Sequence, residues 1–430
     1  MSEMSDEKES LIPAQDQFIS SLKDENLMFQ DRLNSYEAWK SCPAPTRKDE
    51  FWKYTQVGPL LKKTYRIANA TSIAARPIEK SQKAINLVFV NGIFSASDSD
   101  SIDRYGLAVS DLRSAIALEK LELAHLQMLE DKSDYFSLLN RSFYQNGPFI
   151  SIGKNCTLEK PIHIVHVLTE SDRLINIKGL VVVGEGASVR ISETWESGDS
   201  RDNLLNTTTA LSLKANASVE LIKIQSIGEN NNLVSQEFAT VQKDAKLSIN
   251  TISTEGNLIR NNIHVSLMGE GGECYLNGLF LGAGNQHIDN HTIVNHDVPN
   301  CYSNELYKGI LSEKAKGVFN GKVIVKKDAQ KTNAFQYNGN LLLGDEAQIY
   351  SKPELEIYAD DVKCSHGSTT GQLNKEALFY LESRGISKEG AKHLLVYAFA
   401  QEVLEKISLP ELRDKIDAHL AKRFQVLQDA

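Results

Sequence analysis

The feature that most constrains this chain is a short phrase that recurs between residues 148 and 370. Each copy is a turn with a small residue, followed by the start of a strand-like run. The spacing between copies is about 30 residues at most steps and about 45 residues once. Such self-similarity is typical of a solenoid, in which each coil buries its apolar face only by stacking on the next. The copies are Gly186-Ala-Ser-Val189, Asn216-Ala-Ser-Val219, Asp244-Ala-Lys-Leu247, Gly272-Glu-Cys-Tyr275, Lys316-Gly-Val-Phe319 and Glu346-Ala-Gln-Ile349.

Short β-rich runs lie between these turns, and none of the intervening segments has a convincing helical period. The clearest are residues 162–167, 179–183, 218–224, 247–252 and 323–325. We therefore predict a mainly β protein whose core, residues 148–371, is a stacked β-solenoid of the β-helix kind. A large β-sandwich or jelly roll is the competing architecture, because it is also built from short strands.

Residues 1–147 are predicted to form a mixed α/β region. Apolar residues recur at roughly helical spacing before residue 70 and again between about 110 and 145. Between them, Asn91-Gly92 separates two apolar runs and predicts a β-hairpin. The segment 46–55 is interpreted as the solvated start of a helix, with Phe51 and Trp52 buried against the next domain. The helical positions are Leu22, Leu27, Leu33, Trp39, then Leu112, Ile116, Leu121, Leu126, Leu129, Phe136, Leu139 and Phe143.

Residues 372–430 return to a helical period and predict three amphipathic helices that pack as a bundle. Asn374 and Ser387 can cap the first two helices, and Gly385 can end the first. Ser408-Leu-Pro-Glu411 has the pattern of a capping box with proline in the first turn.

Composition excludes several classes of protein. The formal net charge of the 430 residues is −9, which argues against non-specific nucleic-acid binding. No apolar run approaches the length of a membrane span, and the acidic N-terminus is unlike a targeting peptide. The five cysteines are scattered and never form a CxxC pair, so we expect a protein of the reducing cytoplasm.

The most chemically suggestive residues are Cys364 and His366, which follow a strand and two carboxylates, Asp360 and Asp361. In an extended chain, residues two apart project to the same face, so this thiol and imidazole can point at one spot. Both groups bind zinc or iron, and a thiolate can also carry sulfur. The alternative is that Cys364 is a small buried residue and His366 a turn residue. The adjacent aspartates would face opposite ways in a strand and make a poor acid/base pair.

A second cluster is His287, Asp289 and His291, with His296 and Cys301 just beyond. Its spacing could hold a metal, or it could form a polar ladder on a solvated face of the solenoid. The sequence has no Walker-type phosphate loop, no HExxH helix and no GxSxG nucleophile elbow. A self-sufficient enzyme is therefore not visible.

Several longer motifs give a resemblance to the SufB/SufD family of iron–sulfur cluster assembly proteins, and within it to the SufD branch. The resemblance spans nearly the whole chain and is strongest around residues 352–372. The motifs are Arg47–Tyr54, Phe89-Val-Asn-Gly92, Phe319-Asn-Gly-Lys-Val-Ile-Val325, Ala329-Gln-Lys-Thr332, Asn340-Leu-Leu-Leu343, Lys352–Gly367, Gly371-Gln372 and Phe379-Tyr-Leu-Glu-Ser-Arg-Gly-Ile386.

This resemblance implies a right-handed parallel β-helix and a non-catalytic scaffold subunit that also assists iron acquisition. It implies pairing with a SufB-like subunit near the end of the solenoid. A SufC-like ABC ATPase would bind the C-terminal helices, so ATP would act only through that partner. A cysteine desulfurase system would be linked indirectly, and neither nucleic acid nor membrane would be a partner.

The resemblance also implies a transient iron–sulfur cluster at the subunit interface. His366 is the favoured ligand on this chain, whereas Cys364 is a second ligand, a sulfur relay or a buried filler. His287, Asp289 and His296 are expected to form a polar, structural or channel-lining set, and His291 is left out of it. Two other functions stay open: a β-helix enzyme acting on polysaccharides, and an interaction protein without a metal role.

Overall fold

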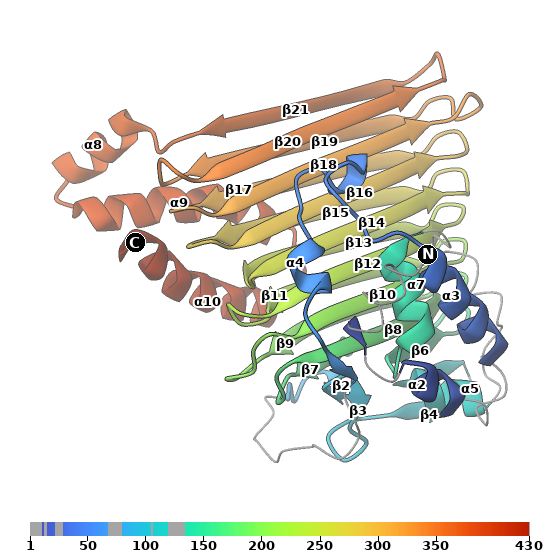
Figure 1. Cartoon of the computed structure of the whole chain (residues 1–430). Helices are drawn as coiled ribbons and strands as arrows, with labels where there is room; N and C mark the ends of the chain where they lie inside the picture. Colours follow the sequence, from blue (N-terminus) through green and yellow to red (C-terminus); the bar gives the residue numbers. More distant parts are fainter. Residues whose placement is uncertain are drawn as a thin grey trace.

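The structure is a computed structural model, which describes residues 11–12, 15–21, 29–67, 80–104, 106–118 and 134–429. Two long sheets face each other and wind together along the chain (Figure 1). From β6 onward, each strand pairs with the strand two further along the chain, and all of these pairs are parallel. This order is that of the predicted β-solenoid, with about eight coils. A jelly roll, whose strands run antiparallel, is excluded for this part of the chain.

Sheet A contains eleven strands and sheet B contains ten. In spatial order, sheet A consists of β20 (Gln348–Ile357), β18 (Lys316–Val325), β16 (His287–His296), β14 (Leu258–Leu267), β12 (Asn232–Val241), β10 (Leu204–Leu213), β8 (Arg173–Val183), β6 (Pro148–Ile152), β5 (Leu107–Asp111) and β4 (Ile102–Arg104), with β1 (Arg66–Ile67) beside β8. Sheet B consists of β21 (Lys363–Gly371), β19 (Asn333–Leu342), β17 (Tyr302–Leu311), β15 (Glu273–Gly282), β13 (Lys246–Glu255), β11 (Ser218–Ser226), β9 (Ser188–Glu196), β7 (Ile162–Val167), β2 (Ile85–Val90) and β3 (Ile93–Phe94).

The turn phrase of the sequence marks two different corners of the coil. Its first four copies precede sheet B strands, and its last two precede β18 and β20 of sheet A. The single long step is therefore about one and a half coils rather than an irregular repeat. At the first corner a residue with positive φ recurs in successive coils, at Gly186, Asn216, Asp244, Gly271 and Asn300. Glycine, asparagine and aspartate tolerate that conformation best, which explains the turn residues.

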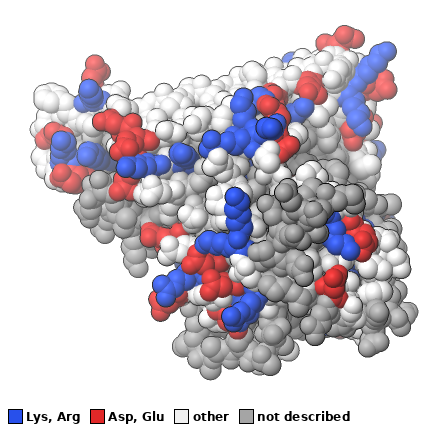
Figure 2. Space-filling view, in the orientation of Figure 1, with Lys and Arg blue, Asp and Glu red and all other residues white. Residues whose placement is uncertain are grey.

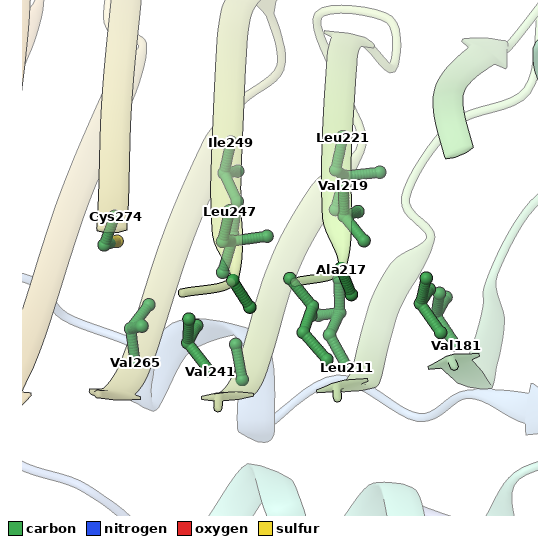
Figure 3. Packing of buried hydrophobic residues seen from close by; sticks show 14 of the residues in the cluster. Val181, Leu211, Ala217, Val219, Leu221, Val241, Leu247, Ile249, Val265 and Cys274 are labelled. Carbon is green, nitrogen blue, oxygen red and sulfur yellow. The ribbon is translucent and has the colours of Figure 1, made fainter. Parts of the chain in front are cut away.

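The core lies between the two sheets, where alternate side chains from both sheets meet. Figure 3 shows two facing rows of these residues. Val241 and Val265 project from sheet A, and Leu247, Ile249 and Cys274 project from sheet B; all are at most 3% exposed. Each coil adds one layer to this stack, so the ends of the solenoid are the places where inward-facing residues lack a neighbour.

The N-terminal region supplies the terminal strands at one end of the solenoid, β5 and β4 in sheet A and β2 and β3 in sheet B. The helices α2 (Gln15–Ser21), α3 (Phe29–Ser41) and α7 (Tyr135–Phe143) form an aromatic cluster around Trp39 and Phe143, and α7 is fully buried against β8 and β10. The helix α5 (Leu112–Ala117) also belongs to this region. The predicted hairpin at Asn91-Gly92 is confirmed, with β2 and β3 antiparallel. The predicted helical positions Leu22, Leu27, Leu121, Leu126 and Leu129 lie outside the described residues.

Residues 46–57, which we call the N-terminal strap, run across the outer face of sheet A and contain the short helix η1 (Glu50–Trp52). The helix α4 (Gly58–Leu61) follows the strap (Figure 1). Trp52 is buried as predicted, and its ring lies against Phe136 of α7. The prediction is wrong for Phe51, which is 48% exposed.

The predicted C-terminal helices are α8 (Lys375–Ser383), α9 (Lys388–Leu404) and α10 (Pro410–Asp429). Asn374 and Ser387 cap α8 and α9 as predicted, and Gly385 follows α8 with φ +87°. Ser408 does not cap α10; its hydroxyl and backbone N–H instead donate to Glu220 of β11. The helices contact one another in order, and α9 also packs on β15 and β17 (Figure 1). No helix in the described part of the chain is long and apolar enough to cross a membrane.

Candidate functional site

The two last strands, β20 and β21, form the open end of the solenoid. Each is the edge strand of its sheet and pairs on one side only. Their inward-facing side chains therefore have a coil below them and no coil above them. Cys364 and His366 lie on β21, so the predicted metal-binding pair is at this open end.

Register shows that Cys364 and His366 face inward. Cys364 pairs with Ala334 and His366 with Gln336, and both of these β19 residues are buried. Because alternate residues of a strand share a face, the two side chains project to the same side, as predicted. His366 is exposed, whereas Cys364 is half-buried and packs against the core. Burial raises the pKa of the Cys364 thiol, so this group is protonated at neutral pH.

Two contacts between hydroxyl groups lie further along β21. Ser368 Oγ lies 2.7 Å from Ser351 Oγ of β20, which joins the two sheets across the last coil. Tyr337 Oη lies 2.8 Å from Thr369 Oγ1 on the outer side of β21. These contacts fix both edge strands and leave the imidazole of His366 open to a molecule that approaches from the end.

Below His366 the same column of sheet B is polar and buried. Gln336 is directly beneath His366 in register, and Glu305 is beneath Gln336. Gln336 Nε2 donates to Glu305 Oε1 at 3.0 Å, and Thr292 of β16 donates to Glu305 Oε2. Glu305 is 1% exposed, and burial raises its pKa to about 7.

The second predicted cluster lies on the outer face of sheet A, and the structure buries it under the strap. His287, Asp289 and His291 share that face, as their spacing indicates. Thr55 of the strap donates to Asp289 Oδ2 and lies 2.7 Å from His287 Nε2. The interpretation as a ladder on a solvated face is therefore wrong, because Asp289 is 0% exposed.

Asp289 compensates a buried guanidinium. Arg260 Nη1 of β14 lies 2.6 Å from Asp289 Oδ2, and His291 Nε2 lies 3.0 Å from Asp289 Oδ1. Burial opposes ionisation of Asp289, but Arg260 and His291 outweigh it and hold the pKa of this carboxyl well below its ordinary value. Burial lowers the pKa of His287 and, together with Arg260, that of His291. The arrangement is that of a structural ion pair.

The other predicted residues are separate from both groups. His296 faces the solenoid interior, is 0% exposed and lies 2.8 Å from Ser303 Oγ, and burial lowers its pKa to about 4. Cys301 is buried at a corner, where its thiol donates to Gly269 O at 3.4 Å. Asp360 and Asp361 lie in the turn between β20 and β21 and not in a strand, so the alternation of strand residues does not set their directions.

The open end of the solenoid carries only part of a metal-binding site. Within the described residues, no group of three or more His, Cys, Asp or Glu side chains could hold a metal ion. Cys364 and His366 supply two donors, whereas iron–sulfur centres generally take four ligands. A metal species bound here would need ligands from a second molecule.

Sequence reasoning missed Thr55 and Arg260 of the strap cluster, and Gln336 and Glu305 below His366. The solenoid period could have identified the latter two, because Glu305, Gln336 and His366 follow one another at about 30 residues. Nothing comparable points to Thr55, because its partners are more than 200 residues away in the chain.

Comparisons with known proteins agree with this architecture. Residues 166–399 match the family model described as SUF system FeS cluster assembly, SufBD core domain, and residues 7–164 match that of the SufBD protein N-terminal region. The chain is 30% identical to the iron–sulfur cluster assembly protein SufD of Escherichia coli, over 88% of this chain and 89% of that protein. It is 29% identical to a SufBD family protein of Synechocystis, over 93% and 92% of the two chains. It is 28% identical to the chloroplastic protein ABCI7 of Arabidopsis thaliana, over 90% and 84%.

Proposed function

The chain belongs to the SufBD family of iron–sulfur cluster assembly proteins, and we propose that it is a SufD-like, non-catalytic scaffold subunit that holds one side of a nascent cluster. The cluster is the cargo of the complex rather than a resident cofactor. The observation that carries the proposal is the pair Cys364 and His366, which is incomplete as a metal site and lies at the uncovered end of the solenoid.

The partner that completes the site is a SufB-like subunit. Edge strands present unpaired backbone N–H and C=O groups, and β20 and β21 both do so at the open end. Large apolar side chains are exposed there as well: Tyr337, Tyr350, Ile357 and Tyr358 are between 36% and 62% exposed. Figure 2 shows few charged side chains along the middle of the upper edge of this view, where β21 and its neighbours lie. Exposed apolar side chains beside unpaired edge strands favour association with another solenoid.

His366 is the ligand that this chain contributes to the interface. Its imidazole is exposed, and a neutral imidazole binds iron through one ring nitrogen. Cys364 is half-buried and its thiol is protonated, so it becomes a ligand only when iron or another subunit displaces the proton. The partner then supplies the remaining ligands, and its departure frees the cluster for transfer.

A SufC-like ABC ATPase is proposed to bind the C-terminal helices. Phe379 and Tyr380 of α8 are 74% and 57% exposed, and Leu394 of α9 is 45% exposed. Figure 1 shows α8 extending away from the sheets beside β21. A motor attached to α8 and α9 would act close to the open end, and ATP would then bias an open or closed arrangement of the cluster interface.

We also propose a cytoplasmic location, a supporting role in iron acquisition and an indirect link to a cysteine desulfurase system. All five cysteines are free, which fits a reducing compartment.

The test is anaerobic co-expression of this chain with a SufB-like and a SufC-like protein, followed by iron and sulfide analysis of the purified complex. His366→Ala is expected to leave the complex assembled and to reduce its iron and sulfide at least severalfold. Ser365→Ala, on the opposite face of the same strand, is the matched control and is expected to have no effect.

Normal iron and sulfide in His366→Ala would show that the ligand assignment is wrong. A wild-type complex that assembles without iron would instead support the metal-free interaction protein.

A further inference from the structure

The column beneath His366 is built from side chains that differ in what they can donate and accept. His366, Gln336 and Glu305 occupy the same position in three successive coils. Neighbouring strands are about 4.8 Å apart, so each side chain meets the one above and the one below it. Gln336 and Glu305 are 3% and 1% exposed, and their contacts are therefore made inside the protein.

The chemistry of Glu305 fixes the orientation of the Gln336 amide. Both carboxylate oxygens of Glu305 accept hydrogen bonds, one from Thr292 and the other from Gln336 Nε2. At pH 8, above the pKa of about 7, Glu305 is mainly ionised and only accepts, so the nitrogen of the amide faces Glu305. Gln336 Oε1 is left buried without a protein donor, and the neighbour on the other side of the column is His366. A buried acceptor without a partner is destabilising, so a donor at this place stabilises the site.

We propose that Gln336 is a positioning residue for His366: its side-chain oxygen, held in place by Glu305, accepts a hydrogen bond from one ring N–H of His366. The other ring nitrogen then carries the lone pair and is the atom presented to iron. The presentation of a ring nitrogen to iron rests on the proposed function, whereas the hydrogen bond between Gln336 and His366 needs no metal.

This arrangement follows the usual logic of metal-binding histidines, whose second nitrogen is held by an oxygen acceptor that selects the tautomer and fixes the ring. An exposed imidazole without such a partner divides its population between two tautomers and several rotamers. The Gln336 contact lets a site with few ligands present its nitrogen in one orientation before the partner subunit arrives.

The test uses the full-length chain without metal, labelled with ¹⁵N in its histidine rings. At pH 8 the imidazole of His366 is expected to show the ring nitrogen shifts of a single tautomer; its signal is identified by its loss in His366→Asn. Gln336→Met keeps the length of the side chain and removes the acceptor, and it is expected to give averaged shifts for His366 alone. Gln242→Met, the same change in a turn before β13, is the matched control.

A second variant, Glu305→Gln, releases the Gln336 amide to rotate and is expected to move the His366 shifts in the same direction. It also serves if Gln336→Met does not fold. Unchanged His366 shifts in whichever of these variants folds would overturn the proposal.

In the co-expressed complex, Gln336→Met is expected to reduce bound iron about tenfold, at the lower end of the range for residues that hold a metal ligand. Failure of the proposed function gives a different pattern. If His366→Ala complexes hold normal iron while the tautomer responds to Gln336→Met, the hydrogen bond stands and the ligand assignment falls.

Discussion

The ion pair beneath the strap gives a sharp test of how this protein is held together. Asp289→Asn keeps the shape of the side chain and removes its charge. Arg260 is 2% exposed and lies 2.6 Å from Asp289, so the variant leaves a buried guanidinium without its ion-pair partner. Breaking one side of a buried ion pair typically costs about 3–5 kcal/mol, and we expect a loss in this range.

The measurement is urea unfolding followed by tryptophan fluorescence at pH 7.5. Trp52 reports on the site directly, because the Arg260 guanidinium carbon lies 3.8 Å from the centre of its ring. The control is Glu346→Gln, which breaks a salt bridge with Lys314 on the surface. The side chains of Lys314 and Glu346 are 61% and 69% exposed. That change is expected to cost about 0–1 kcal/mol.

A double variant separates the charge from the other contacts of Asp289. Arg260→Met combined with Asp289→Asn removes both charges, so we expect it to be less destabilised than the sum of the single changes. A loss below about 1 kcal/mol in Asp289→Asn would refute the reasoning, since the buried guanidinium would then have been compensated by something other than Asp289.

Three further predictions follow from single residues. Burial lowers the pKa of His296 to about 4 in the folded protein, whereas the pKa of an unfolded imidazole is about 6.5. The contribution of His296 to stability is therefore fully present above pH 6.5, and the free energy of unfolding falls by about 3 kcal/mol as the pH is lowered to 4. His296→Gln is expected to remove that part of the pH dependence in urea unfolding. Gly278→Ala would place its Cβ 2.2 Å from the ring of Tyr307, so we expect the free energy of unfolding to fall by about 1–3 kcal/mol in the same assay. In the control Gly367→Ala the nearest atom to the new Cβ is 3.6 Å away, and wild-type stability is expected. Equal stability of the two variants would contradict the packing around Gly278. Asn374→Ala removes the N-cap of α8 and is expected to destabilise that helix by about 1 kcal/mol. The measurement is amide hydrogen exchange, which should become faster in α8 alone. Unchanged exchange in α8 would show that the cap is dispensable.

The parts of the fold that depend on neighbours in sequence could be predicted well. The solenoid repeats because every coil must present the same corners and the same inward positions, and the turn at Asp244 carries that information within a few residues. The caps at Asn374 and Ser387 were predictable for the same reason, since a cap involves only the next turn of helix. The predicted cap at Ser408 is wrong because its hydroxyl donates instead to the carboxylate of Glu220, on a strand that is distant in sequence.

The candidate site shows the same division. Strand alternation was enough to place Cys364 and His366 on one face, and His287 with Asp289 on another. It could not indicate that the first face is open and the second is covered, because that depends on which strand is last in the stack and on where the strap lies. Trp52 and Thr55 contact residues more than 200 positions away, and no local pattern records such a contact.

Two contacts of the strap depend on the far end of the solenoid. The strap precedes the solenoid in the chain, yet Glu50 pairs with Lys352 of β20 and Tyr54 stacks on Tyr350. Lys352 and Tyr350 leave the ribosome about 300 positions later, so these two contacts must wait until nearly every coil has stacked. Trp52 and Thr55 can pack earlier, once β14 and β16 have formed. Closing so large a loop is slow, and the contact forms only when β20 is in register. The last contacts of the strap are therefore made only once β20 is in place, beside β21 and the residues that are proposed to meet iron.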